Sequence, residues 1–256
     1  MICSAKSDIG MKRNVNQDSY ILKTFSEKTA LCVVCDGMGG AKGGEEASKI
    51  ASRTFVDSVS EFLTPYVGTS DKSIHVSAIR ENLIESVEKA NMAVYSYAKS
   101  HSSLKGMGTT LVAALIIGNS VFCINVGDSR MYFIKGSKIR QITKDHSYVQ
   151  YLIDIGQLTE KEAESFPSRN VITRAVGTEP TVTPECFREN AADGTFVLLC
   201  SDGLTNFVKN DEIRTIIAKD SKNIDQIALG VRVNKLIDTA NKNGGADNIT
   251  AAVIKI

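Results

Sequence analysis

The chain has 256 residues, of which 43% are hydrophobic, and this length fits one large domain with a substantial core. Its 30 basic and 29 acidic residues leave a net charge of +1, which argues against a nucleic-acid-binding protein. No apolar segment reaches the ~18 residues that span a bilayer, and the first residues lack the apolar core of a signal peptide. We therefore expect one domain over residues 1–256, in a cytoplasmic, monomeric protein with neither nucleic acid nor a membrane as a partner.

The first half of the chain alternates short apolar patterns with two long helical ones. Apolar runs of five or six residues predict strands, and apolar residues that recur every three or four positions predict helices. The stripe from Ile79 to Tyr97 keeps helical spacing throughout, and we interpret it as core packing. The predicted strands cover residues 2–7, 19–24 and 31–35, and the predicted helices cover about 44–62 and 76–101.

The second half is dominated by strand patterns in hairpin order. The predicted strands cover residues 110–117, 121–126, 131–134, 138–142, 196–200 and 249–256, and the predicted helices cover about 209–219 and 223–242. Many strands in hairpin order with segregated helices are typical of an α+β protein. The expected architecture is a central β-sandwich of two antiparallel sheets flanked by α-helices.

The stretch from Asp145 to about Val176 departs from this pattern. It is mixed in composition, helical in places and poor in long apolar stripes. Such a segment can leave the sheet and act as a lid or substrate flap. Two short surface helices without that role explain the pattern equally well, and both interpretations stay open here.

Six cysteines are scattered along the chain, and Cys32 and Cys35 form a C-x-x-C pair. Such a pair can bind zinc or undergo redox chemistry. If residues 31–35 are a strand, however, positions three apart point to opposite faces, and no second Cys or His pair lies at ligand spacing. We therefore interpret the cysteines as reduced core residues.

The most distinctive stretch runs from Leu31 to Ser48 and has the sequence LCVVCDGMGGAKGGEEAS. Its apolar run ends at Asp36, which places a carboxylate at the rim of the core. Five glycines follow and let backbone groups approach a ligand closely, and a helix with Glu45 and Glu46 in its first turn comes next. Taken alone, an ordinary strand, Asp-Gly turn and helix explain the stretch equally well.

Aspartates stand at the ends of several predicted strands. Three follow a strand and two precede one, and antiparallel neighbours bring such ends to the same edge of a sheet. The five residues are Asp36, Asp128, Asp202, Asp18 and Asp247. Five carboxylates that converge without partners would resist ionisation, so we expect a bound multivalent cation.

The types of donor indicate which cation this is. No His or Cys accompanies the aspartates, and the chain has only three histidines. Oxygen ligands alone favour Mg²⁺ or Mn²⁺ over Zn²⁺. Two such ions about 3.5–4 Å apart can activate water for an in-line phosphoryl displacement. Arg13, in the loop before Asp18, is a candidate phosphate ligand, although a solvated loop arginine explains that residue when it is taken alone.

Other phosphate chemistries have sequence signatures that this chain lacks. No cysteine is followed six positions later by arginine, which excludes a cysteine-nucleophile tyrosine phosphatase. The nucleotide-binding P-loop G-x-x-x-x-G-K-[ST] is absent, and so is the motif set of protein kinases.

The order of the motifs along the chain resembles that of the protein phosphatase 2C family, the metal-dependent serine/threonine phosphatases, and the compact form is similar to the bacterial branch. The segments are RNVNQDS (13–19), VVCDGMGGAKGGEEAS (33–48), GMGTTLVAAL (106–115), INVGDSRMY (124–132), ITKDHS (142–147), RAVG (174–177), LLCSDGL (198–204) and GGADNITAAVI (244–254). The resemblance spans nearly the whole chain. It implies hydrolysis of phosphoserine and phosphothreonine in phosphorylated proteins, by water activated between two metal ions. It also implies a bacterial serine/threonine kinase as the counterpart.

The resemblance further implies roles for individual residues in two metal sites. Asp36 would bridge the two ions, with the carbonyl of Gly37 on one of them. Asp202 and Asp247 would complete the other site, and Asp18 would hold water at the metal.

Two further implied roles concern the phosphate and an additional ion. Arg13 would bind the substrate phosphate. A third, weaker metal site would fall on Asp128, with Ser147 and Asp202. The flap of the bacterial branch corresponds to roughly residues 147–172. This range lies within the stretch from Asp145 to about Val176 described above, which we call the excursion.

One position departs from the pattern of several eukaryotic members, which have a histidine two residues after the bridging aspartate as a proposed general acid. Here that position is Met38, so water at the metals or a phosphate oxygen must supply the proton to the leaving alkoxide. His146 lies near by in the motif series, and we expect it to help position the flap and not to act as the acid.

Two other functions stay open. A catalytically silent scaffold would keep the fold but lose metal-binding acids, whereas Asp18, Asp36, Asp202 and Asp247 are all present. A regulatory phosphatase dedicated to one phosphorylated switch protein is compatible with the sequence, because that choice depends on surface and flap contacts.

Overall fold

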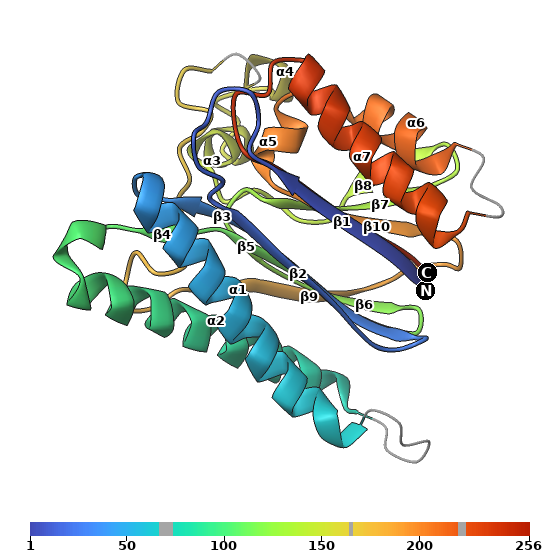
Figure 1. The fold of residues 1–256 in the computed structure, drawn as a ribbon, viewed down its shortest axis with the longest axis horizontal. Coiled ribbons are helices and arrows are strands. Elements are labelled where there is room, and N and C mark those ends of the chain that lie inside the picture. The colour runs from blue at the N-terminus through green and yellow to red at the C-terminus, as the bar shows by residue number, and fades with distance from the viewer. Residues whose placement is uncertain (67–73, 164–165, 220–223) are drawn as a thin grey trace.

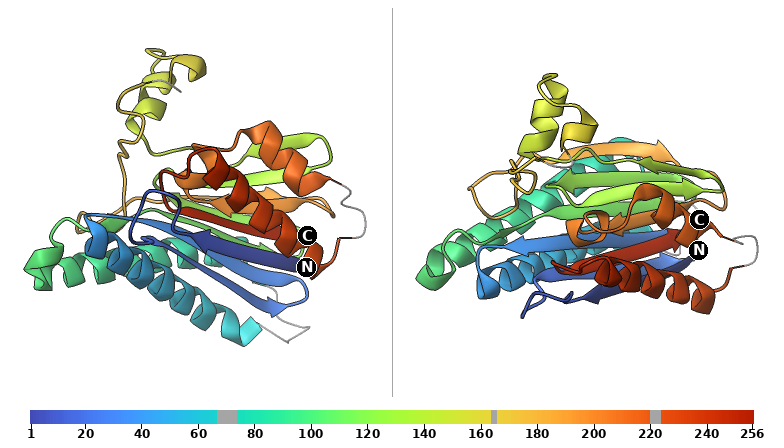
Figure 2. Two further views of the ribbon diagram at one scale, coloured as in Figure 1. Left: turned by 45° about the horizontal axis from the view of Figure 1, so that its top comes forward. Right: turned by 90° about the horizontal axis from the view of Figure 1, so that it is seen from above.

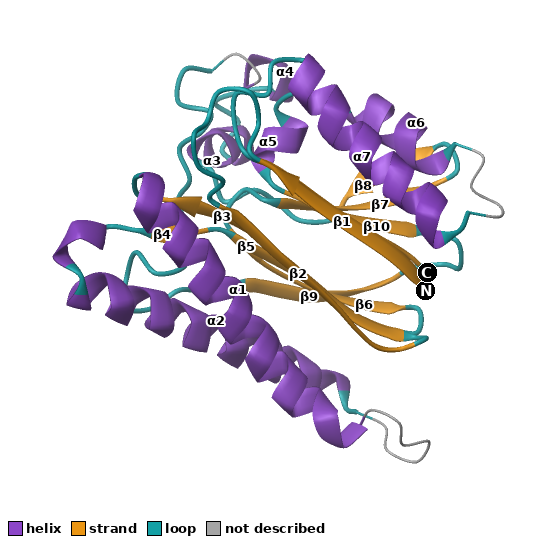
Figure 3. Cartoon of the chain, in the orientation of Figure 1, coloured by secondary structure: helices purple, strands orange, loops and turns teal. Residues whose placement is uncertain are grey.

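The computed structural model describes residues 1–66, 74–163, 166–219 and 224–256. Its strands form two sheets that face each other, and long helices cover the two outer sides (Figure 1). Figure 3 shows the resulting layers, with the helices outside and the strands between them. The α+β sandwich of antiparallel sheets predicted from the sequence is confirmed.

In the described residues, the first sheet has five strands in the order β1-β11-β10-β7-β8, and every pairing is antiparallel. The strands are β1 (Ile2–Asp8), β7 (Arg130–Lys135), β8 (Lys138–Gln141), β10 (Phe196–Cys200) and β11 (Ile249–Lys255). β11 therefore lies between β1, from the other end of the sequence, and β10.

The second sheet has the order β2-β3-β5-β6-β9, and the short β4 pairs with β3. Its strands are β2 (Asp18–Ser26), β3 (Thr29–Met38), β4 (Gly108–Thr109), β5 (Leu111–Ile117), β6 (Ser120–Val126) and β9 (Glu185–Asn190). Asp18 lies directly opposite Asp36 in the β2–β3 pairing. Like charges in such a position destabilise a sheet, so this pairing calls for a functional explanation.

Two groups of helices cover the outer faces of the sandwich. α1 (Ala41–Leu63) and α2 (Val76–Ser100) lie on the second sheet, whereas α5 (Asp202–Thr205), α6 (Asn210–Ala218) and α7 (Gln226–Lys242) lie on the first (Figure 1). Single 3-10 turns at Thr64–Tyr66 and Ser102–Leu104 follow the two long helices. Among the described residues, no helix is both long and apolar enough to cross a lipid bilayer.

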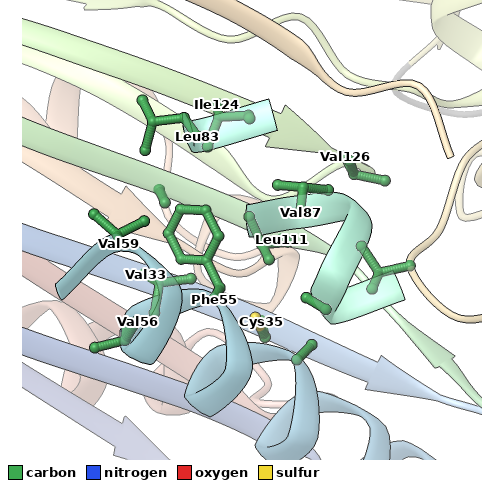
Figure 4. Close-up of a cluster of buried hydrophobic side chains, with 14 of the residues drawn as sticks. Val33, Cys35, Phe55, Val56, Val59, Leu83, Val87, Leu111, Ile124 and Val126 are labelled. Atoms are coloured by element: carbon green, nitrogen blue, oxygen red, sulfur yellow. The ribbon is translucent and has the colours of Figure 1, made fainter. Parts of the chain in front are cut away.

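The core has three parts, one between the sheets and one under each group of helices. Phe55 of α1 is fully buried among side chains of β3, α2 and β5 (Figure 4). Burying one side chain of this size stabilises the fold by about 1.5–3 kcal/mol. This packing fixes α1, and with it the glycine-rich loop at its start.

Both faces of β3 are buried, which explains its continuous apolar sequence. Val33 and Cys35 face the helices, whereas Cys32 and Val34 face the other sheet. The two cysteines of the C-x-x-C pair are therefore free thiols in different parts of the core, and their interpretation as reduced core residues is confirmed.

Two short helices, α3 (Tyr148–Asp154) and α4 (Glu160–Ala163), stand away from the sandwich in both views of Figure 2. An isolated antiparallel bridge between Ser147 and Ile172 closes the base of this excursion. The excursion lies in the range of about 147–172 where the sequence analysis expects a flap, and residues 164–165 of this range lie outside the described residues.

The start of α1 differs from the prediction. The helix begins at Ala41 and not near Gly44, and no acidic residue lies in its first turn; the predicted acidic first turn is wrong. Glycine has a low helix propensity, which disfavours a helix that includes Gly43 and Gly44. In the structure, however, the Gly44 amide already donates a helical hydrogen bond to the Gly40 carbonyl, at 3.1 Å.

Smaller differences concern three elements that the sequence did not predict. The first is the short strand β4, just before the predicted strand that starts at residue 110. β9 (ECFREN) is an edge strand with only partly buried residues, so it lacks a strong apolar signal. α5 is a single turn after β10. The last helix begins at Gln226, and residue 223 of the predicted range lies outside the described residues.

Candidate active site

A cleft of about 530 Å³ lies where the aspartate-bearing strand ends meet. Its walls combine the loop before β2, the end of β3, the glycine-rich loop and the turns that precede β7, α5 and β11. The predicted site residues on these walls are Arg13, Asp36, Gly37, Asp128, Asp202 and Asp247. The walls also contain Lys12, Asn14 and Asn170, which the sequence analysis did not single out.

Asp18 lies behind the cleft wall, where its side chain is almost fully buried. Its Oδ2 accepts hydrogen bonds from Ser201 Oγ at 2.7 Å and Thr250 Oγ1 at 2.6 Å. Its Oδ1 has no partner among the described residues. Burial, together with the nearby carboxylates of Asp202 and Asp247, raises the pKa of Asp18 to about 7.

The other carboxylates of the cleft disfavour one another's charge. Burial, followed by the charges of Asp18 and Asp202, raises the pKa of Asp36 well above its usual range. Burial and Asp202 raise the pKa of Asp128 to about 7. The pKa of Asp202 is also raised, by burial and by Asp247. A bound multivalent cation would reverse this, because it favours the ionised form of every one of these groups.

Arg13 and Asp247 form an ion pair across the mouth of the cleft. Arg13 Nη2 donates to Asp247 Oδ2 at 2.8 Å, and the side chains are 48% and 33% exposed. The loop that carries Arg13 is held by Asn248, whose side-chain amide donates to the carbonyls of Ile9 and Val15. The backbone anchors the loop, and the ion pair with Asp247 holds the guanidinium beside the carboxylates.

The residues that hold these acids in place were not predicted from the sequence. Ser201, Thr250 and Asn248 bear no charge and belong to no chemical motif that spacing alone would reveal. Their only signal is position, because Ser201 directly precedes Asp202 and Asn248 directly follows Asp247.

His146 and Ser147 do not line the cleft. His146 is 6% exposed, and its Nδ1 accepts a hydrogen bond from the Gly127 amide at 3.1 Å. Its Nε2 lies 3.3 Å from Glu185 Oε1. The pKa of His146 is lowered by burial and by the charge of Arg174. This histidine connects the base of the excursion to the turn that carries Asp128.

Ser147 has a structural role at the same base. Its side chain caps α3 by accepting a hydrogen bond from the Gln150 amide, at 3.2 Å. Of the three residues expected at a third metal site, the cleft therefore brings together Asp128 and Asp202 but not Ser147.

The donor set of the cleft fits a hard divalent cation. It consists of carboxylate oxygens with the Gly37 backbone, the ligand types that Mg²⁺ and Mn²⁺ prefer. Asp18 Oδ1 and Asp202 Oδ1 are buried oxygens without a hydrogen-bond partner in the described residues. Among all the residues that the structure describes, no group of three or more His, Cys, Asp or Glu side chains is already arranged to hold a metal ion.

Comparison with known proteins identifies the class to which this fold and site belong. A family model described as protein phosphatase 2C matches residues 11–229. The chain therefore belongs to the protein phosphatase 2C family, and its relatives place it among the bacterial members.

Relatives match along nearly their full length. Protein phosphatase PhpP from Streptococcus pneumoniae is 34% identical over 256 residues, which cover 100% of this chain and 98% of PhpP. The structure of serine/threonine phosphatase Stp1 from Staphylococcus aureus has a TM-score of 0.84 at 35% identity, with 100% of this chain and 95% of Stp1 covered. The catalytic domain of PstP in complex with two manganese ions has a TM-score of 0.79 at 31% identity and covers 98% of this chain and 96% of that domain.

Proposed function

We propose that this protein hydrolyses phosphoserine and phosphothreonine in phosphorylated proteins and depends on two Mg²⁺ or Mn²⁺ ions. The observation that carries the proposal is the convergence of four carboxylates and one guanidinium on a single open cleft. The names of the relatives support the activity, since PhpP and Stp1 are called phosphatases. The manganese complex of PstP supports the number of ions.

Asp36, Asp202 and Asp247, with the Gly37 carbonyl, would hold the ions. Such ions, when bound, supply positive charge for the phosphoryl oxygens and lower the pKa of water in the cleft. Asp18 supports this arrangement from behind, because Ser201 and Thr250 hold one of its oxygens and leave the other available. Asp128 would contribute to a third, weaker site.

Arg13 would bind the substrate phosphate through its planar guanidinium. In the structure this group is held by Asp247. If Asp247 were to hold a cation, Arg13 would lose this partner and its guanidinium would be available to the phosphate. The same ion pair thus keeps Arg13 at the cleft while the substrate is absent.

Met38 lines the cleft at the position where several eukaryotic members have a histidine. The thioether of methionine has no proton to donate. The proton for the leaving serine or threonine oxygen therefore comes from water or from the phosphate itself. His146 is buried outside the cleft, which supports a positioning role for it.

The biological setting belongs to the same proposal. We infer that a bacterial serine/threonine kinase produces the phosphoproteins on which this enzyme acts, and that the excursion between Ser147 and Ile172 serves as a flap beside the cleft. The position of Asn170 and Ile172 on the cleft wall supports that role for the flap.

The test is hydrolysis of a phosphothreonine peptide by the wild type with Mn²⁺, by the wild type with EDTA, and by Asp36→Asn with Mn²⁺. We expect activity only in the first case, with a decrease of about 10³-fold in the variant, equivalent to several kcal/mol of lost charge stabilisation. Activity that persists in EDTA and in the variant would place the chemistry elsewhere.

A further inference from the structure

A second hollow of about 380 Å³ adjoins the cleft. Met38 and Ile172 line both spaces, so the two are continuous at these residues. We call the second hollow the flank groove and define it by Met38, Ile172, Arg174, Glu179, Thr181 and Thr183. It begins where a phosphorylated side chain would enter the cleft and extends along the segment that leads into β9.

The outer wall of the flank groove is fixed to α2. Asn91 of α2 is 1% exposed, and its side chain donates to the carbonyls of Glu179 and Pro180 at 3.0 and 3.1 Å. The same side chain accepts a hydrogen bond from the Gly177 amide at 2.7 Å. Gly177 has φ +90°, and a Cβ there would lie 2.1 Å from Val94 Cγ1, so the turn fits only without a side chain. A wall held in this way binds a ligand without first having to become ordered.

The groove surface offers polar groups to an extended chain. Residues 181–184 have no assigned secondary structure and lie outside any ladder of the described strands, and the exposure of residues 181–183 alternates. Val182 is partly buried against the core, and it lines the groove together with the exposed Thr181 and Thr183. A segment outside any ladder can accept a peptide strand through backbone hydrogen bonds.

The flank groove contains one basic and one acidic residue, Arg174 and Glu179, and of the two only Arg174 takes part in an ion pair among the described residues. Arg174 lies 3.8 Å from Glu185 and donates to the Thr183 carbonyl at 3.5 Å, so its charge already has a partner. Glu179 is exposed, and none of the ion pairs of the described residues includes it.

We propose that the flank groove binds the residues on one side of the phosphorylated residue as an extended segment, and that it favours a basic side chain there through Glu179. This inference rests on the proposed function and deepens it by naming a feature of the substrates. The groove contributes to recognition of the polypeptide, whereas the cleft holds the phosphate.

The first test compares two phosphothreonine peptides that differ only in carrying Arg or Glu beside the phosphorylated residue. With Mn²⁺-loaded wild type, we expect kcat/KM to be about three- to fivefold higher for the Arg peptide, as for an exposed charge pair. Glu179→Lys should move the Arg-to-Glu ratio by about tenfold in favour of the Glu peptide. Glu61→Lys makes the same change of charge at an exposed site on α1, and it should leave the ratio at its wild-type value.

The second test obstructs the groove. Thr181→Trp should lower kcat/KM for a ten-residue phosphopeptide about tenfold relative to p-nitrophenyl phosphate, which occupies the cleft alone. Thr24→Trp, an exposed threonine on β2 six residues from Asp18, is the matched control and should leave this relative value unchanged.

The two proposals fail in different ways. The proposal for the flank groove would be overturned if the enzyme hydrolysed both kinds of substrate but the variants had no effect. In that outcome Glu179→Lys would not alter the Arg-to-Glu peptide ratio, and Thr181→Trp would not alter the ratio of phosphopeptide to p-nitrophenyl phosphate hydrolysis. The proposed function would remain intact. Absence of hydrolysis of both the phosphopeptides and p-nitrophenyl phosphate by folded, Mn²⁺-loaded wild type would contradict the proposed function. In that case the anisotropy of a fluorescent, non-hydrolysable phosphonate peptide still tests the groove, because only groove binding makes its affinity depend on Glu179.

Discussion

The carboxylate of Asp36 is surrounded by like charges. Asp18 stands opposite it across the β2–β3 pairing, and Asp128 and Asp202 raise its pKa together with burial. Without a cation, this arrangement costs free energy of folding. Functional sites commonly carry such a cost, since residues selected for chemistry are not selected for stability.

Asp36→Asn should therefore raise the melting temperature of the metal-free protein, although it removes activity. The neutral amide takes away repulsion from the neighbouring acids, and we expect an increase of a few °C, equivalent to about 1–2 kcal/mol. Calorimetry in EDTA measures the change. Asp57→Asn, at an exposed position of α1, is the control. A melting temperature below that of the wild type would show that the Asp36 charge is not destabilising.

The acidic residues of the site could be predicted from the sequence, whereas the residues that hold them by hydrogen bonds could not. An aspartate beside an apolar run identifies itself by type and position. The hydrogen bonds from Ser201 and Thr250 to Asp18 arise because the end of β10 lies beside the start of β11 and because Asp18 faces them from the other sheet. That information belongs to the packing of the two sheets and has no local trace in the sequence.

The helices α7 and α1 each contain a glycine, and the space available for a side chain differs between the two positions. Alanine normally stabilises a helix relative to glycine by about 0.8–1 kcal/mol. In α7, a Cβ at Gly230 would lie 3.6 Å from Ser4 Oγ, an ordinary contact. In α1, a Cβ at Gly44 would lie 2.1 Å from Gln17 Nε2 and 2.7 Å from the carbonyl carbon of Gly37, which no local adjustment of the Gly37 backbone can accommodate.

We therefore expect Gly230→Ala to stabilise the protein by up to about 1 kcal/mol and Gly44→Ala to destabilise it. Gly44→Ala should also lower activity, because the displaced backbone carries Gly37 and adjoins Asp36. Urea unfolding followed by circular dichroism measures both variants against the wild type. Equal stabilisation by the two substitutions would mean that α1 is not held tightly against the end of β3.

The same contact explains why the start of α1 was predicted incorrectly. The helix was predicted to start at about Gly44, but the lack of a side chain at Gly44 is what allows the first turn of the helix to approach Gly37 at the end of β3. The edge strand β9 escaped prediction for a different reason, since it is only partly buried and its apolar pattern is weak. Strands and helices with a fully buried face, such as β3 and α2, were predicted to within a few residues.

At the scale of the whole molecule, the raised pKa values of the buried aspartates make the free energy of unfolding depend on pH. In the metal-free protein, Asp18 and Asp128 have pKa values of about 7, above the ~3.9 of an unfolded aspartate. Between these values the folded state binds more protons than the unfolded state, so the free energy of unfolding falls as the pH rises from about 4 to about 7.

We expect the melting temperature in EDTA to decrease over this pH range, and saturating Mn²⁺ to reduce that dependence by keeping the carboxylates ionised. Asp128→Asn should weaken the dependence in EDTA, because it removes one of the groups responsible. Scanning calorimetry at pH 5, 6 and 7 provides the comparison. Parallel curves with and without Mn²⁺ would contradict the assignment of these acids to a cation site.

The position of β11 between β1 and β10 has a consequence for synthesis in the cell. A ribosome synthesises β1 before the other described strands, but among them β1 pairs only with β11, whose residues 249–255 are made some 240 residues later. Asp247 emerges only just before that strand. A growing chain can therefore neither close its first sheet nor assemble the full set of acids until this point. The proposed site is therefore assembled only once β11 has been synthesised, after the segments that form every other described strand.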